Sequence, residues 1–138
     1  MQDKIIGITA GAMDLLHLGH IIMLEEYKNQ CNHLIVCLQT DPTIDRPNSK
    51  NKPIQSIFER YMQLRACKYV DEIIVYETES DLYDILSTIK FSMRFIGADW
   101  KDKKFTGNDI IMGRIIYNER KHNYSTTELR QRIQERKN

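Results

Sequence analysis

The chain has 138 residues, a length that suits a single domain with one buried core. Its 20 basic and 19 acidic residues give a formal net charge of +1, so the composition predicts neither a nucleic acid nor a membrane surface as partner. Three scattered cysteines favour a reducing compartment over a disulfide framework or a zinc site. No signal peptide is visible, so we expect a cytoplasmic protein.

Apolar runs of strand length recur along the chain, at 5–9, 34–38, 72–76, 94–97 and 115–117. Amphipathic stretches of helical length follow them, at 19–31, 56–68, 80–90, 107–113 and 126–136. This alternation predicts the α/β class, as a Rossmann-like open parallel sheet of about five strands with helices on both faces. The strands are apolar almost throughout, as burial on both faces requires.

Helix starts and a long loop complete this organisation. Ser56 with Glu59, and Ser125 with Glu128, have the spacing of a capping box at a helix N-terminus. Segment 41–53 contains three prolines and no apolar periodicity, and the same α/β pattern continues on both sides of it. A structureless segment of this length is often functional. We therefore expect one domain over residues 1–138 with a lid-like loop at about 41–53.

The sequence GAMDLLHLGH, residues 11–20, connects the first strand to the first helix. Ligands of an open parallel sheet bind outside the carboxyl ends of its strands, where a helix N-terminus offers free N–H groups and a positive dipole end to an anion. His17 and His20 could donate hydrogen bonds to phosphate oxygens, while Gly11 and Gly19 allow close approach or a left-handed dihedral angle. Two alternatives stay open: a metal pair without an evident third ligand, and ordinary capping or core histidines.

In this place the H-x-G-H motif resembles the signature of the nucleotidyltransferase superfamily, and the chain is most similar to its glycerol-3-phosphate cytidylyltransferase family. The segments that carry the resemblance are DLLHLGH (14–20), LIVCLQTD (34–41), ER (59–60), KYVDEII (68–74), FIGADW (95–100) and RKHNYSTTELR (120–130). The resemblance implies transfer of a nucleotidyl group from a nucleoside triphosphate to a phosphorylated alcohol, with release of pyrophosphate and without a protein nucleophile. It also implies Mg²⁺ or another divalent cation, held mainly by the substrate phosphates, with Asp14 as a candidate ligand.

The resemblance further implies three sets of site residues. The catalytic set is His17, His20, Lys50, Lys52 and Arg120, and which loop lysine is the catalytic one stays open. The nucleotide-binding set is Ala12, Met13, Asp14, Gly19, Asp99, Trp100, Ser125, Thr126 and Thr127. The acceptor-binding set is Arg60 and Lys68.

Each assignment has a structural alternative that involves no ligand. Asp14 could form an Asx turn, Ser125 could serve only as a helix cap, and Trp100 could belong to the core. The loop lysines and Arg60 could be solvated surface charges. The sequence also departs from the family on the acceptor side, because segment 77–86 is acidic where the family carries a basic residue. An acidic wall of this kind favours an acceptor with an amine or a larger polyol.

The leading hypothesis is therefore a cytidylyltransferase that transfers CMP from CTP to glycerol 3-phosphate or a similar phosphorylated alcohol, giving a CDP-alcohol for the cell envelope. An adenylyltransferase of the same fold that acts on a sugar phosphate is the first alternative, because STTELR also resembles the motif of those enzymes. A weakened nucleotide-binding regulatory module is the second. The expected partners are CTP, the acceptor and a second copy in a homodimer, without nucleic acid or membrane.

Overall fold

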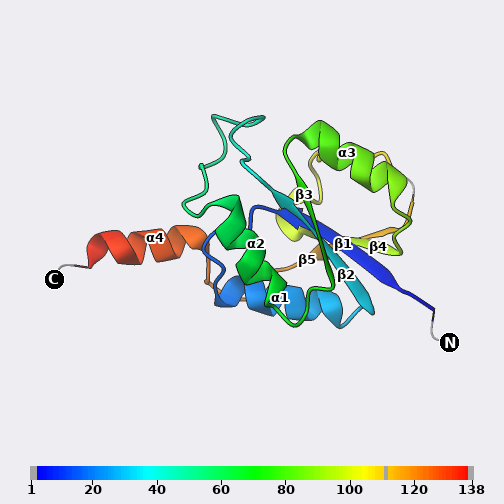
Figure 1. Cartoon of the computed structure of the whole chain (residues 1–138), viewed down its shortest axis with the longest axis horizontal. Helices are drawn as coiled ribbons and strands as arrows, with labels where there is room; N and C mark the ends of the chain where they lie inside the picture. The colour runs from blue at the N-terminus through cyan, green and yellow to red at the C-terminus, as the bar shows by residue number, and fades with distance from the viewer. Residues whose placement is uncertain (1–2, 111, 137–138) are drawn as a thin grey trace.

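The computed structural model describes residues 3–110 and 112–136, and these form one five-stranded sheet with helices on both faces (Figure 1). The elements in chain order are β1 (Ile6–Gly11), α1 (Leu18–Lys28), β2 (His33–Gln39), α2 (Ile57–Arg65), β3 (Glu72–Tyr76), α3 (Glu79–Thr88), β4 (Met93–Gly97), a 3₁₀ turn η1 (Ala98–Trp100), β5 (Arg114–Asn118) and α4 (Thr126–Glu135). All strand pairs are parallel and the strand order is β3-β2-β1-β4-β5. The predicted fold class is confirmed.

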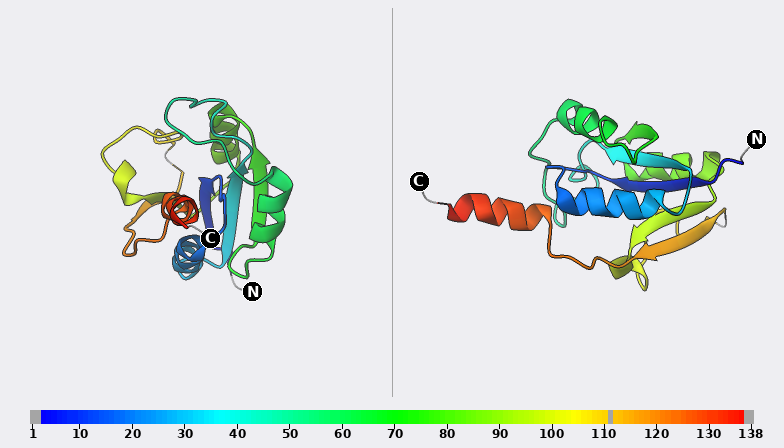
Figure 2. Two further views of the ribbon diagram at one scale, coloured as in Figure 1. Left: turned by 90° about the vertical axis from the view of Figure 1, so that its left-hand side faces the viewer. Right: turned by 90° about the horizontal axis from the view of Figure 1, so that it is seen from below.

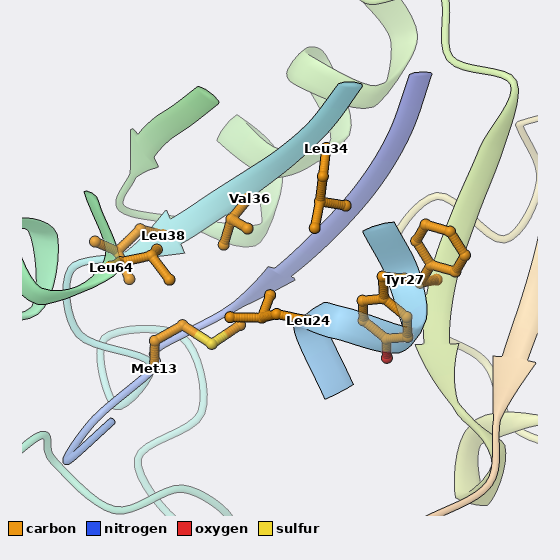
Figure 3. Packing of buried hydrophobic residues seen from close by; sticks show 8 residues of the cluster. Met13, Leu24, Tyr27, Leu34, Val36, Leu38 and Leu64 are labelled. Atoms are coloured by element: carbon orange, nitrogen blue, oxygen red, sulfur yellow. The ribbon is translucent and has the colours of Figure 1, made fainter. Parts of the chain in front are cut away.

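Strand β2 supplies both faces of the core, because successive side chains of a strand point to opposite sides of the sheet. Leu34, Val36 and Leu38 pack with Leu24 of α1 and Leu64 of α2 on one face (Figure 3). The alternate β2 residues, Ile35 and Cys37, pack on the other face with Leu82 and Leu86 of α3. This is why the strand reads as a continuous apolar run rather than as an alternating one.

The order in which the chain adds strands to the sheet reverses at β1. From β1 the chain runs outward through β2 to β3, and then crosses to β4 and β5 on the opposite side of β1. The loops that leave β1 and β4 therefore diverge at the carboxyl edge of the sheet, which is where ligands bind in this architecture. Helix α4 extends away from the sheet at the same edge (Figures 1 and 2).

The helix starts follow the predicted capping pattern, with one difference. Ser56 and Glu59 form a reciprocal capping box at the start of α2. Ser125 caps α4 by accepting a hydrogen bond from the backbone N–H of Glu128, but the Glu128 carboxylate pairs with Arg132 and does not complete the box. In the part of the chain described, no helix is long and apolar enough to cross a membrane.

The prediction of a helix at 107–113 is wrong. The described residues of this segment form turns and bends, while Ile111 lies outside the described residues. Gly107 and Gly113 have φ angles of +79° and +75°, in the left-handed region that interrupts a right-handed helix. Apolar spacing alone suggested the helix, and the two glycines override it.

Candidate active site

A cleft of about 1380 Å³ opens at the carboxyl edge of the sheet, between the loops that leave β1 and β4. The starts of α1 and α4 line one part of it, and segment 41–53 and the start of α3 line another. The sequence-predicted residues that line the cleft are Ala12, Met13, Asp14, His17, Gly19, His20, Lys50, Asp99, Trp100, Arg120, Ser125, Thr126 and Thr127. Residues far apart in the sequence, such as Asp14 and Asp99, thus line one cavity, as the position of the switch point predicts.

The two histidines form the N-terminal cap of α1. Nδ1 of His17 accepts the backbone N–H of Gly19 at 3.0 Å, and Nδ1 of His20 accepts the backbone N–H of His17 at 3.2 Å. This is a capping box in which imidazoles take the places of the usual serine and glutamate. The three-residue spacing of H-x-G-H is the spacing that such a box requires.

This cap fixes the tautomer of both rings. A nitrogen that accepts a hydrogen bond carries no proton, so each neutral imidazole has its N–H at Nε2. Burial, followed by the neighbouring His17, lowers the pKa of His20 to about 4. Burial also lowers the pKa of His17, with smaller contributions from His122 and Arg120. Both rings are therefore neutral donors near pH 7, with Nε2–H left for a ligand.

Gly19 makes room for a second loop beside this cap. A methyl group on its Cα would lie 2.8 Å from Cε1 of His17, 2.9 Å from the carbonyl oxygen of Tyr124 and 3.0 Å from Cε1 of His122. One of these atoms is backbone and cannot move cheaply. Glycine at this position thus allows segment 122–124 to close against the start of α1.

The strained backbone lies elsewhere than expected. Neither Gly11 nor Gly19 has a positive φ angle, whereas Met13 and Leu15 have φ angles of +50° and +52°. Left-handed backbone costs a residue with a side chain roughly 1–2 kcal/mol. Such conformations persist where the surroundings hold them and concentrate at functional sites. They bracket Asp14.

Asp14 is an anchor between distant segments rather than an Asx turn. Its carboxylate accepts the backbone N–H groups of Ile54 at 2.8 Å and Gln55 at 3.0 Å, and pairs with Arg130 of α4 at 3.1 Å. These contacts occupy both oxygens of a buried side chain. Among the described residues, no group of three His, Cys, Asp or Glu side chains is arranged to hold a metal ion.

The start of α4 faces the histidines with a second set of donors. The hydroxyl of Ser125 is used as the helix cap, and that of Thr126 donates to the carbonyl oxygen of Asp14 at 3.3 Å. Thr127 lines the cleft with no hydrogen bond from its hydroxyl to another described residue. Arg120 adds a positive charge at the same rim.

The predicted lysines separate in the structure. Nζ of Lys50 lies 6.0 Å from the centre of the Trp100 ring and lines the cleft together with Asp99. Lys52 is exposed and does not line the cleft. Of the two loop lysines, the geometry therefore favours Lys50 as the one that reaches a bound nucleotide.

The two predicted acceptor residues do not line the cleft. Arg60 is 2 % exposed, and its guanidinium donates to the carbonyl oxygens of Ala12, Gln39, Thr40 and Gln55. It is therefore not a solvated surface charge, as the alternative reading had it. Lys68 is exposed, with Nζ 5.2 Å from the centre of the Tyr69 ring. Their role toward an acceptor stays a prediction, and this geometry does not favour it.

The part of the cleft beside segment 41–53 and the start of α3 contains charges that the sequence did not point out. Arg46, Glu79 and Arg94 line it. Of the acidic residues in 77–86, Glu79 alone among those described lines the cleft, and its carboxylate pairs with Arg46 at 2.7 Å. The expected acidic wall is therefore wrong, because Glu77, Asp81 and Asp84 do not line the cleft and Asp81 belongs to the cap of α3. One signal was available, since an arginine inside a strand buried on both faces is unusual.

A helix N-terminus capped by two neutral histidines, at the switch point of a parallel sheet and opposite a second helix N-terminus, defines the nucleotidyltransferase class of α/β proteins. Comparison with known proteins makes this specific. The chain belongs to the cytidylyltransferase-like family, which matches residues 8–132.

The chain is also similar to individual curated proteins. The bifunctional protein HldE of Campylobacter jejuni (serotype O:6) is 32% identical over 136 residues, which is 99% of this chain and 29% of that protein. HldE of Caulobacter vibrioides is 29% identical over 127 residues, 90% of this chain and 26% of that protein. The chain thus spans less than a third of the length of these relatives.

Solved structures share the fold. The lipopolysaccharide core biosynthesis protein of Thermoplasma volcanium is 28% identical with a TM-score of 0.67, over 89% of this chain and all of that one. The pantoate-beta-alanine ligase of Francisella tularensis, at 18% identity and a TM-score of 0.55 over 92% of this chain and 62% of that one, supports the fold alone.

Proposed function

We propose that the chain transfers CMP from CTP to the phosphate of a phosphorylated alcohol and releases pyrophosphate. The observation that carries this proposal is the histidine cap, which holds two neutral imidazoles with Nε2–H available in the cleft. Donors fixed in advance toward developing charge cost no reorganisation during the reaction. The match to the cytidylyltransferase-like family supports nucleotidyl transfer, and CTP as the donor is the proposed choice within it.

The reaction needs positioning rather than a protein nucleophile. An oxygen of the acceptor phosphate attacks the α-phosphorus of CTP and forms a new P–O bond. The bond between the α-phosphorus and the oxygen that bridges the α- and β-phosphates breaks, and pyrophosphate leaves with the electron pair. His17, His20 and the start of α1 stabilise charge on the α-phosphate, whereas Thr127, Arg120 and Lys50 suit the β- and γ-phosphates.

We propose that Mg²⁺ enters as part of the nucleotide substrate, bound to its phosphate oxygens. Both carboxylate oxygens of Asp14 are already engaged, so this side chain is a poor metal ligand as it stands. Phosphate oxygens are ligands that Mg²⁺ prefers, and it commonly keeps several waters beside them.

The direct test uses CTP labelled at the α-phosphorus, Mg²⁺ and glycerol 3-phosphate, and follows labelled CDP-glycerol and pyrophosphate. We expect acceptor-dependent release of both products in equal amounts. His33 offers a matched control, because this histidine lies at the opposite edge of the sheet and pairs with Glu72. His33→Asn should keep full turnover. CTP binding without product from a series of phosphorylated alcohols would instead support a nucleotide-binding regulatory module.

Adenylyl transfer to a sugar phosphate is the second candidate. Arg130, the arginine that follows STTEL, lines the cleft beside Asp14, and it belongs to the pattern shared with adenylyltransferases. Competition of unlabelled ATP against labelled CTP separates the two candidates. If ATP at equal concentration abolishes incorporation and yields the product itself, the adenylyl assignment replaces the cytidylyl one.

A further inference from the structure

Arg94 is a buried charge in the middle of the sheet. It lies in β4 and is 7% exposed, on the face that packs against α3. Its Nη1 donates to the carbonyl oxygen of Thr106 at 2.5 Å, and its guanidinium carbon lies 5.3 Å from the centre of the Phe105 ring. Among the described residues, this is its one hydrogen bond. An arginine carries five N–H donors, so most of its hydrogen-bonding capacity is unused.

The carboxylate of Glu79, which lies in the same part of the cleft, is committed to other partners. Glu79 pairs with Arg46 at 2.7 Å and accepts the Thr106 hydroxyl at 2.9 Å. In the described part of the chain, no carboxylate oxygen lies within 4 Å of the Arg94 guanidinium nitrogens. Burying a charge without a partner is costly. Arg94 and Arg46 together outweigh Glu79, so this end of the cleft is electropositive.

Arg94 lies deep in the cleft relative to the histidine cap. In the β1–β4 pairing it stands opposite Ile8, three residues before the carboxyl end of β1 at Gly11. At about 3.3 Å per residue, this places Arg94 roughly 10 Å behind the edge where the nucleotide phosphates are expected. Because Arg94 lines the same cleft as His17 and His20, a single extended molecule can reach both ends.

We propose that Arg94 determines acceptor specificity by binding a second anionic group, at the end of the acceptor remote from the phosphate that attacks CTP. This inference rests on the proposed transfer reaction and narrows its substrate class. The acceptor is a phosphorylated compound of sugar length with a carboxylate or a second phosphate at its far end. The planar guanidinium fork suits either group through two parallel hydrogen bonds.

Three probes with the same six-carbon chain test this inference. Glucitol 6-phosphate, 6-phosphogluconate and glucitol 1,6-bisphosphate differ only at carbon 1, which bears a hydroxymethyl group, a carboxylate and a phosphate ester. Their affinities are measured by calorimetry in the presence of a non-hydrolysable CTP analogue. We expect at least one acidic probe to bind about tenfold or more tightly than glucitol 6-phosphate, the scale of a hydrogen bond to a charged group.

Two substitutions separate recognition from support of the fold. Arg94→Gln keeps a donor for the carbonyl oxygen of Thr106 but removes the charge, and should abolish the preference for the acidic probe while leaving glucitol 6-phosphate binding unchanged. Arg94→Lys keeps the charge without the fork and should retain part of the preference, which secures the test if the glutamine variant does not fold. Arg114→Gln removes an exposed charge at the start of β5 outside the cleft lining and should change nothing.

A gain well below tenfold for both acidic probes, or no gain, would overturn the proposal, as would an equal loss for all three probes in Arg94→Gln. The latter result would make Arg94 a brace for segment 105–107. Binding is read without turnover, so a failure of this inference differs from a failure of the proposed function. If neither CTP nor ATP yields product, the transfer reaction is refuted even where the acidic preference stands.

Discussion

The imidazole rings of His17 and His20 lie with their centres 3.9 Å apart, and both Nδ1 atoms accept backbone N–H groups at the same helix start. Each ring therefore has one nitrogen committed to the fold and one available to a ligand. Because Nδ1 has the structural role and Nε2 is left for a ligand, suitable substitutions can remove one role and keep the other.

Substitution of His20 by asparagine should remove the chemical role and keep the structural one. The Asn amide oxygen stands near the place of Nδ1 and can accept the N–H of His17, whereas no group replaces Nε2–H. We expect kcat/KM for nucleotidyl transfer to fall by about a hundredfold or more, the scale for losing one preorganised donor. The free energy of unfolding, measured in urea, should stay within about 0.5 kcal/mol of the native value.

His20→Gln provides the reciprocal variant. Its amide lies nearer the place of Nε2 and can donate to a phosphate, but it cannot cap the helix in the same way. We expect it to lose more stability and less turnover than His20→Asn. If both variants lose turnover only in proportion to lost stability, His20 acts solely as a cap.

Stability should decline in mild acid because of the histidine cap. The folded-state pKa of His20 is lowered to about 4, so between pH 6.5 and 4 the unfolded chain binds a proton that the folded chain does not. The free energy of unfolding therefore decreases as the pH is lowered through this window, by at most about 1.4 kcal/mol per pH unit from this group. The difference in unfolding free energy between the native chain and His20→Asn isolates the effect, since other groups cancel. A difference that is the same at pH 7 and pH 5 would contradict the assignment.

Asp14→Asn should loosen segment 41–53. The two carboxylate oxygens now accept one backbone N–H group each, and a single amide oxygen cannot replace both. The amide nitrogen is a donor, so it cannot accept the hydrogen bond that Arg130 donates. We expect a loss of about 1–3 kcal/mol in the free energy of unfolding. Trypsin reports the loop directly, because Lys50–Asn51 is its cleavable bond there, Arg46 and Lys52 being followed by proline. Cleavage after Lys50 should accelerate in this variant and stay unchanged in Asp102→Asn, a substitution of an exposed residue.

Arg60→Met should be severely destabilising although the position is on a helix. The substitution leaves carbonyl oxygens of Ala12, Gln39 and Thr40 without the guanidinium that pairs them. We expect about 3 kcal/mol or more in the free energy of unfolding, as for buried polar networks that lose a charged member. Arg65→Met, at the exposed end of the same helix, should cost about 1 kcal/mol or less. Similar losses for both variants would show that the carbonyl contacts of Arg60 contribute little.

The sheet and most helices were predictable because their signals are local. Continuous apolar runs mark strands covered on both faces, and the Ser56–Glu59 spacing marks a helix start. The predicted helix at 107–113 failed because a positive φ angle at Gly107 depends on what packs there: a methyl group would meet Leu86 and Arg94 within 3 Å. Such contacts come from residues distant in the sequence.

The part of the site around the histidine cap was also accessible from sequence, because the spacing of His17 and His20 encodes a cap that a few neighbouring residues can form alone. The surroundings of Arg60 and Arg94 were not accessible in this way. The burial of Arg60 and Arg94 depends on which loops cover them. The left-handed angles of Met13 and Leu15 have no signal in residue type, since neither is glycine or asparagine.

The contacts of Asp14 have a mechanical consequence. Its carboxylate holds residues 54 and 55, which directly follow segment 41–53, and it also pairs with Arg130 of α4. One side chain therefore joins the end of the loop segment to the C-terminal helix. A displacement of either element would therefore disturb the contacts of the other, because both depend on the two oxygens of one carboxylate.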